Sequence, residues 1–573
     1  MTVGNSLPGR ESHPSPDEMS GRRCPRSVLI LVCVVATIIN ALSFGASQLW
    51  VSPDASYYVE LAGGIADRSD FASELFLIRP PGYPLMLAAI FRVFGGHSPE
   101  AIMVVQHAMV VATTVLIAFI AWRLTANRLV ASLAGVMAAC SLQLLAYSNL
   151  IMTEVPYTLA LAGSVCFLVC FHQSGRWRSL VLASLLGGVG YLFRPIGLSV
   201  VAVCVVAGLH HVWRSHGVSL HRQTTGALGN TDTPIAPLGS FVCQPLRAVW
   251  RRALTACVLA IGPAWLVTLP SSVHNKLLHG GDLSSRCANL ALYFRILYMD
   301  KLDSPHSEAL ADIRTVVDEA IARGALSPDA DYRLWGDVWK AYHAVRGVGL
   351  SKAAEVMGDA ARDLIREHPY ATIDKTMRYS LWMVLVPDGF YRFHPGGAPG
   401  MRSPKGECVR DTKADILAAD TYEPMLRHWI DPYHHYLPLR SDATALTPIW
   451  RGLARSFYHR IEKGSSVLGI GDSPYEAFGW FCFLGMGASL LAQNRSTWLL
   501  IAGVIALQVV VSAFLAGPTP RYAVPVRPLL LLYPSIVVWA PLHIVRRISA
   551  SRIVQRRRAE ELSGTGGAVP STA

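Results

Sequence analysis

The hydrophobic residues of this chain are gathered into runs of roughly 20, separated by polar segments. A helix that crosses a bilayer needs about 20 consecutive apolar residues, because the hydrocarbon layer is about 30 Å thick. The runs therefore predict an all-α polytopic membrane protein with about ten transmembrane helices. The predicted spans are 27–49, 100–122, 129–147, 152–171, 179–193, 195–213, 253–270, 476–492, 497–516 and 524–543.

Two further apolar stretches are too short to cross a bilayer. Residues 80–95 open with two prolines and contain Arg92, and residues 376–387 form an even shorter run. Both are predicted to be helices that lie at the outer membrane surface. Counting either one as a span would move basic loops or the basic C-terminal tail to the outside. The charge pattern therefore favours ten crossings.

The spans divide the chain into regions of different character. The segment between the seventh and eighth spans holds 25 Lys and Arg against 25 acids, which is an ordinary soluble balance, and its patterns are helical. One predicted helix, 304–324, carries Leu310, Ile313, Val317 and Ile321 on one face. The predicted regions are a disordered cytoplasmic tail (1–26), a membrane module (27–270) with a first external loop (50–99), an external, periplasmic helical domain (271–475), three closing spans (476–545) and a basic cytoplasmic tail (546–573).

Charge fixes the predicted orientation and excludes one class of partner. The chain has 573 residues, 52% hydrophobic and 16% charged, with a formal charge of +12. Of its 51 Lys and Arg, 20 fall in alternate connecting segments and the two tails, against six acids. This is the positive-inside pattern, so both termini are predicted to be cytoplasmic. Because the excess charge reports topology, nucleic acid is excluded as a partner.

Charged residues recur at the predicted outer ends of the spans. Asp54 follows the first span together with Tyr57, and Arg79 opens an Arg-Pro-Pro-Gly-Tyr83 turn before the surface helix. Three more charged sites lie at the same predicted depth on the external face. They are Glu154 in a Thr-Glu at the start of the fourth span, Arg194 in a Phe-Arg-Pro turn, and Arg521 with Tyr522 in Arg-Tyr-x-x-Pro.

The order of these motifs resembles the GT-C glycosyltransferases, polytopic enzymes that take a sugar from a polyprenyl-phosphate carrier. This superfamily includes the protein O-mannosyltransferases and the lipid A aminoarabinose transferases. The resemblance covers about 27–275 and 476–545. It implies a GT-C-like fold, a bacterial plasma (inner) membrane location with the active site facing outside, and direct displacement with inversion at the sugar carbon. Many members carry Arg-Asn after the seventh span, where this chain has His274-Asn275.

The chemistry of such a transfer assigns roles to these residues. A sugar on a lipid phosphate already has a good leaving group, so the lipid-linked donor suffices and neither a nucleotide nor a redox cofactor is required. The acceptor hydroxyl needs a general base, and the departing phosphate needs positive charge. By the resemblance, Asp54 is the candidate base. The other candidates are Glu154 as a second catalytic acid, Arg79, Arg194, Arg521 and Tyr522 for the donor phosphate, and Tyr57, Tyr83, His274 and Asn275 for acceptor or donor binding.

Each candidate also has a purely structural interpretation. Asp54 and Glu154 suit helix N-termini, and Arg79 suits a membrane interface with its charged end in water. His107, inside the second span, is predicted to be a core histidine bonded to a neighbouring helix. His434 and His435 lack nearby acids, and Asp54 has no adjacent second acid, which weakens the case for a divalent metal.

Three functions fit this pattern. The favoured one is a membrane glycosyltransferase that moves a sugar from a polyprenyl-phosphate lipid to a cell-envelope glycan, lipid or protein. A transporter or flippase for a lipid-linked sugar is the rival, although transporters usually keep ionisable residues near the bilayer midplane and show paired repeats. The third is a non-catalytic envelope-assembly protein with the same fold.

Overall fold

A computed structural model gives the fold of most of the chain. The described residues are almost entirely helical, apart from an antiparallel pairing of β1 (Trp50–Val51) with β2 (Leu437–Pro438). The predicted all-α fold class is confirmed for this part of the chain. The structure describes residues 24–46, 50–51, 53–96, 98–229, 243–281, 283–385, 437–438, 482, 484–490, 495–516 and 524–537.

Among the described residues, six helices contain stretches long and apolar enough to cross a membrane. Their outward side chains are apolar, as at Ile30 in the first helix and Trp265 in the fifth, which is what a lipid-facing surface requires. The chain is therefore a polytopic membrane protein. The six are α2 (Arg26–Ala46), α5 (Pro99–Thr125), α8 (Glu154–Ser174), α10 (Leu198–Gly229), α11 (Cys243–His279) and α21 (Arg495–Ala516).

The predicted span at 129–147 is built from two shorter helices. α6 (Arg128–Ala139) ends at Cys140, and α7 (Leu142–Ser148) begins after Ser141. The backbone of Ser141 is extended, with φ −66° and ψ 101°, so the helical hydrogen bonds cannot continue through it. The hydrophobic run does not reveal this break, because the residues on both sides of it are apolar.

Three more predicted spans are short or largely undescribed. α9 (Trp177–Phe193) has 17 residues, and the apolar stretch 524–537 contains α22 (Arg527–Leu530). The predicted span 476–492 lies mostly outside the described residues. A total of ten crossings therefore stays a prediction.

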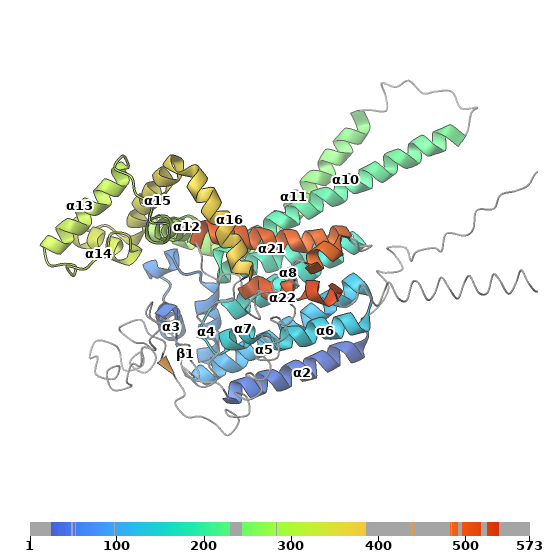
Figure 1. Ribbon diagram of the computed structural model, residues 1–573, viewed down its shortest axis with the longest axis horizontal. Coiled ribbons are helices and arrows are strands. Elements are labelled where there is room, and N and C mark those ends of the chain that lie inside the picture. The colour runs from blue at the N-terminus through green and yellow to red at the C-terminus, as the bar shows by residue number, and fades with distance from the viewer. Residues whose placement is uncertain are drawn as a thin grey trace, which may run out of the picture.

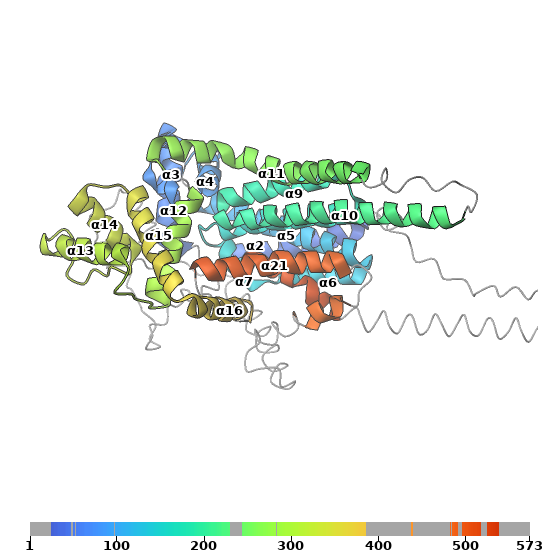
Figure 2. The same cartoon turned by 90° about the horizontal axis from the view of Figure 1, so that it is seen from above.

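The long helices lie side by side with their axes in similar directions (Figure 1). α8 packs on α9, α9 on α11, and α2 on α5. α10 and α11 extend beyond the bundle at one end, whereas the connecting helices gather at the opposite end (Figures 1 and 2). We call that opposite end the site end. It carries α3 (Pro53–Arg68), η1 (Glu74–Leu77) and α4 (Gly82–Val93), and α4 corresponds to the predicted surface helix at 80–95.

The region after α11 is helical over its described residues 283–385, as predicted, and this part extends beyond the site end (Figure 1). The predicted apolar face of its second helix packs inward, with Leu310, Ile313 and Val317 buried and Ile321 against the same core. The elements are α12 (Leu283–Tyr293), the π-helix η4 (Phe294–Met299), α13 (Glu308–Ala322), α14 (Trp335–Arg346), α15 (Leu350–Glu367) and α16 (Pro369–Leu385).

Gly82 sets how closely α4 approaches the end of α9. A Cβ atom at this position would lie 2.6 Å from the Leu192 carbonyl oxygen, which belongs to a rigid backbone. Gly82→Ala is therefore expected to destabilise the protein by about 1–3 kcal/mol, as overpacking does, and to lower the midpoint of thermal unfolding in detergent. The matched control is Gly96→Ala, just after α4, because a Cβ there meets nothing within 4 Å. Equal midpoints for the two variants would contradict this tight contact.

Candidate active site

The first pair of charges at the site end is Asp54 with Arg79. Asp54 lies in the first turn of α3 and not at the cap before the helix. A carboxylate in the first turn is stabilised by the positive end of the helix dipole. Arg79 follows η1 and donates from Nη2 to Asp54 Oδ1 over 2.7 Å. Its guanidinium lies 5.0 Å from the ring centre of Tyr57 and 5.6 Å from that of Tyr58. The arginine is thus held by a carboxylate and two aromatic rings.

The second pair is Glu154 with Arg194. Glu154 begins α8 and Arg194 ends α9, and Arg194 Nη1 lies 2.8 Å from Glu154 Oε1. The side chains are only 1% and 10% exposed, so each charge depends on the other for neutralisation. The second oxygen of Glu154, Oε2, is buried and has no hydrogen-bond partner among the described residues. This pair therefore offers a buried acceptor atom at the site end.

Tyr58 lies close to the first pair, since the Arg79 guanidinium is 5.6 Å from the centre of its ring. The charges of Asp54, Glu154 and Arg194 also act on its hydroxyl, so the second pair belongs to the same neighbourhood. Burial raises the pKa of Tyr58 to about 12, which keeps its hydroxyl protonated at physiological pH. Its ring meets that of Tyr83 edge to face, with the centroids 5.1 Å apart. Sequence reasoning did not select Tyr58 among the site residues.

Gln106 connects Tyr83 to the segment that carries Glu154. Tyr83 donates its hydroxyl to Gln106 Oε1 over 2.9 Å, and burial raises the pKa of Tyr83 well above its usual value. The amide nitrogen of Gln106 donates to the carbonyls of Ser148 and Leu150 at 3.2 and 2.7 Å. Gln106 is fully buried, so each of its polar atoms needs such a partner. The polar residue inside an apolar span was the available signal, and the sequence analysis did not use it.

His107 is a structural residue of the helix core. Its ring nitrogens lie 2.8 Å from Asn40 Oδ1 in α2 and 3.1 Å from Asn149 Oδ1, which follows α7. This confirms the predicted bonding to a neighbouring helix. The histidine therefore joins three segments of the bundle.

His274 and Asn275 support the first loop. His274 Nε2 lies 2.7 Å from the carbonyl oxygen of Phe71, and Asn275 donates to the carbonyl of Phe76 over 2.9 Å. Both residues line an apolar pocket of about 390 Å³ with the Phe71 and Phe76 rings and Leu192. Their polar atoms are thus directed at the backbone that leads to Arg79, and a direct ligand-binding role for them stays a prediction.

The helical region after α11 packs against the first loop. α12 lies on η1, and the Leu350 amide donates to Glu74 Oε2 over 3.0 Å. Burial raises the pKa of the Cys287 thiol in α12. The other candidates cannot be placed, because Arg521 and Tyr522 lie outside the described residues, as do His434 and His435. Within the described ranges, no group of three or more His, Cys, Asp or Glu side chains could hold a metal ion.

The burial of Glu154 and Arg194 makes a prediction about stability. Glu154→Gln or Arg194→Gln alone leaves an uncompensated buried charge and is expected to cost about 3–5 kcal/mol. The double variant removes both charges, so its thermal unfolding midpoint is expected to lie above that of at least the worse single variant. The control is the same set of single and double variants at Asp54 and Arg79, whose side chains are 20% and 18% exposed. There the loss in the double variant is expected to lie closer to the sum of the two single losses. Additive losses at Glu154 and Arg194 would contradict the pairing.

The chain was compared with solved structures, and the alignments cover most of it at low identity. An archaeal oligosaccharyltransferase, AglB from Archaeoglobus fulgidus with an inhibitory peptide and a dolichol-phosphate, aligns with a TM-score of 0.41 and 12% identity over 96% of this chain and 52% of its own. ArnT from Cupriavidus metallidurans bound to undecaprenyl phosphate aligns with a TM-score of 0.33 and 11% identity over 90% of this chain and 78% of its own. The arabinosyltransferase EmbB from Mycobacterium smegmatis aligns with a TM-score of 0.31 and 14% identity over 90% of this chain and 42% of its own. This chain thus spans about half the length of the AglB structure.

A family of known enzymes matches part of the sequence. No curated protein matches the chain. Residues 78–229 match the family model described as dolichyl-phosphate-mannose-protein mannosyltransferase. This segment contains Arg79, Glu154 and Arg194, while Asp54 lies outside it. The predicted resemblance to the GT-C membrane glycosyltransferases is thereby confirmed over residues 78–229.

Proposed function

We propose that this chain is an integral-membrane glycosyltransferase that moves a sugar from a polyprenyl-phosphate donor to a cell-envelope glycan, lipid or protein. One observation carries the proposal. Two carboxylate–arginine pairs lie in the neighbourhood of Tyr58 at one end of an apolar bundle, and three of the four charged residues lie in the segment that matches the mannosyltransferase model. Acids and arginines in one place are what hydroxyl activation and phosphate departure require.

The proposed reaction is a single displacement at the sugar carbon. The acceptor oxygen forms a bond to this carbon while the bond from the carbon to the phosphate oxygen breaks, and the configuration inverts. Asp54 takes the proton of the acceptor hydroxyl. The departing phosphate keeps the electron pair, and Arg79, with Arg194 and Arg521, stabilises its charge by charge-assisted hydrogen bonds.

The Arg79–Asp54 contact suggests how donor binding prepares the base. Arg79 bonds to Asp54 through Nη2. A donor phosphate that binds Arg79 competes for this guanidinium and weakens its hold on the carboxylate, so that the carboxylate can accept a proton. Binding of the donor would thus precede activation of the acceptor. In this scheme Glu154 holds Arg194 in place, and Tyr58 donates a hydrogen bond to the phosphate or the sugar.

The proposal also includes the orientation of the protein in the membrane. The site end faces the outside of a bacterial plasma membrane, and both termini are cytoplasmic, in agreement with the positive-inside charge pattern. α10 and α11 extend from the bundle at the opposite end (Figure 1), and there the C-terminal part of α10 carries Arg222 and the N-terminal part of α11 carries Arg247, Arg251 and Arg252. The helical region 271–475 is proposed to help bind the acceptor, since α12 packs on η1, the element that precedes Arg79.

Asp54→Asn tests the chemistry. The variant keeps the size and hydrogen bonding of the side chain but removes the base, so sugar transfer is expected to fall by about 10²–10⁴-fold. The measurement is incorporation of radiolabelled sugar into membrane acceptors from polyprenyl-phosphate mannose and polyprenyl-phosphate arabinose. Asp67→Asn, on the exposed end of the same helix, is the matched control and is expected to keep activity. A transporter or an assembly protein would largely survive Asp54→Asn in a functional assay, and that result would reject the enzyme.

Binding of the donor lipid tests the arginines separately. In native mass spectrometry of the full-length protein with added undecaprenyl phosphate, the wild type is expected to retain the lipid. The Arg79→Ala/Arg521→Ala double variant is expected to lose it. Arg92→Ala is the control, because Arg92 lies in the same loop region but bonds to the carbonyls of Ile65 and Ala66. Equal retention by all three proteins would reject the phosphate assignment, and absence of lipid from the wild type would reject the donor class.

A further inference from the structure

The amphipathic pattern of α16 is the reverse of that of a soluble helix. Its outward face is apolar, and its side chains there recur at helical spacing. Its inward face is polar. The outward residues are Tyr370, Ile373, Met377 and Leu381, which are 87%, 61%, 58% and 52% exposed, and the buried polar residues are Thr372, Thr376 and Ser380.

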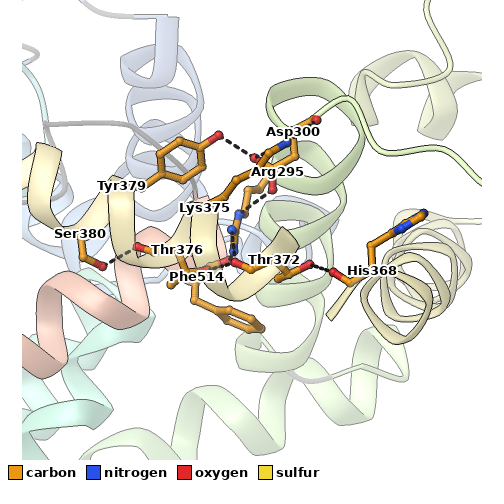
Figure 3. Close-up of polar contacts among 9 residues, drawn as sticks. All are labelled: Arg295, Asp300, His368, Thr372, Lys375, Thr376, Tyr379, Ser380 and Phe514. Atoms are coloured by element: carbon orange, nitrogen blue, oxygen red, sulfur yellow. Dashed lines mark hydrogen bonds and ion pairs between the residues drawn. The ribbon is translucent and has the colours of Figure 1, made fainter. Parts of the chain in front are cut away.

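The inward side of α16 covers a buried ion pair, while the Thr372, Thr376 and Ser380 hydroxyls donate to the carbonyls of the preceding helical turn. Arg295 and Asp300, at the two ends of η4, lie with Nε 3.2 Å from Oδ2, and both side chains are 0% exposed. Two charges withdrawn from water need further partners, and α16 supplies them (Figure 3). Tyr379 donates to Asp300 Oδ1 over 2.7 Å, Lys375 donates to the Asp300 carbonyl over 2.7 Å, and Arg295 Nη2 donates to the Thr372 carbonyl over 3.1 Å.

The same network fixes α16 at the end of a membrane span. Arg295 Nη1 donates to the carbonyl of Phe514 over 2.7 Å, and Phe514 lies in the last turn of α21. Arg295 therefore satisfies one of the carbonyls that a helix C-terminus leaves without an intrahelical partner. Figures 1 and 2 both place α16 beside the site end of α21. Its apolar face thus lies at the level where the hydrocarbon layer ends.

A hydrated flank borders the apolar face. Asp374 and Arg378 form an ion pair one turn apart, with side chains 56% and 77% exposed. They occupy the side of α16 between its apolar outer face and its polar inner face. A helix at a membrane surface has this distribution, with apolar residues in the acyl region and charged residues at the level of the headgroups.

We infer that α16 is embedded in the bilayer surface, with Tyr370, Ile373, Met377 and Leu381 in contact with lipid. A contiguous exposed apolar face marks an interaction surface, and the neighbouring occupant at the end of a membrane span is the bilayer itself. The buried Arg295–Asp300 pair then connects this helix to η4, so the lipid surface holds the helical region in register with the membrane bundle. The inference is independent of the proposed sugar transfer.

Site-specific photo-crosslinking tests the occupant. Benzoylphenylalanine is introduced singly at Ile373 or Met377, and at Asp374 or Arg378 as matched controls on the same helix. The full-length protein is reconstituted into vesicles of phosphatidylethanolamine and phosphatidylglycerol, irradiated and analysed by mass spectrometry. Since all four side chains are exposed, none of these replacements disturbs the core. Phospholipid adducts are expected at positions 373 and 377, with markedly lower yields at 374 and 378.

Three results would overturn the inference. Adducts between position 373 or 377 and another part of the same chain would mean that a protein segment covers the face. Adducts between two copies of the chain would assign the face to a dimer. Equal lipid yields at all four positions would mean that α16 has no preferred face toward the bilayer. Each result leaves the Asp54 and Arg79 experiments unaffected, because none of these substitutions touches the charged pairs.

Discussion

Neutralisation of buried charge is the constraint on which the site end depends. Glu154 is almost fully buried between helices that present apolar residues elsewhere, and a carboxylate in such surroundings is stable only beside a cation. Arg194 provides that cation from the end of α9. Because one residue begins α8 and the other ends α9, the ion pair fixes the relative depth of the two helices at this end of the bundle.

Hydrogen bonds link the first loop to the segment that carries this ion pair. Gln106 holds both the hydroxyl of Tyr83 and the backbone just before Glu154, so a shift of α4 would disturb the second ion pair. Asn275 holds the carbonyl of Phe76, three residues before Arg79. The Asp54–Arg79 pair is thus positioned from both sides by neutral amides, which satisfy buried backbone groups without adding charge. In the proposed mechanism, Arg79 can therefore exchange a carboxylate for a phosphate while these hydrogen bonds keep the framework in place.

The sequence predicted that the charged residues would lie at one depth, but not which of them would pair. Span parity places Asp54, Arg79, Glu154 and Arg194 at the same end of the bundle, because each follows or precedes an apolar run on the same side. Tyr58 and Gln106 could not be selected in this way, since their importance depends on side-chain packing between helices that are distant in sequence. The break at Ser141 was missed because hydropathy does not record backbone conformation. His274 and Asn275 were placed near the site, yet their polar atoms point to the backbone.

The second buried pair shows how one constraint can determine the character of a surface. Arg295 and Asp300 have no access to water, so the helix that covers them must present polar groups to them. α16 does this with the Thr372 carbonyl, Lys375 and Tyr379, and its large apolar side chains are left for the opposite face. A soluble domain would not tolerate that face, whereas a helix beside the end of α21 can place it in lipid. The apolar surface of α16 is therefore a consequence of the charges buried beneath it, and the membrane makes this arrangement stable.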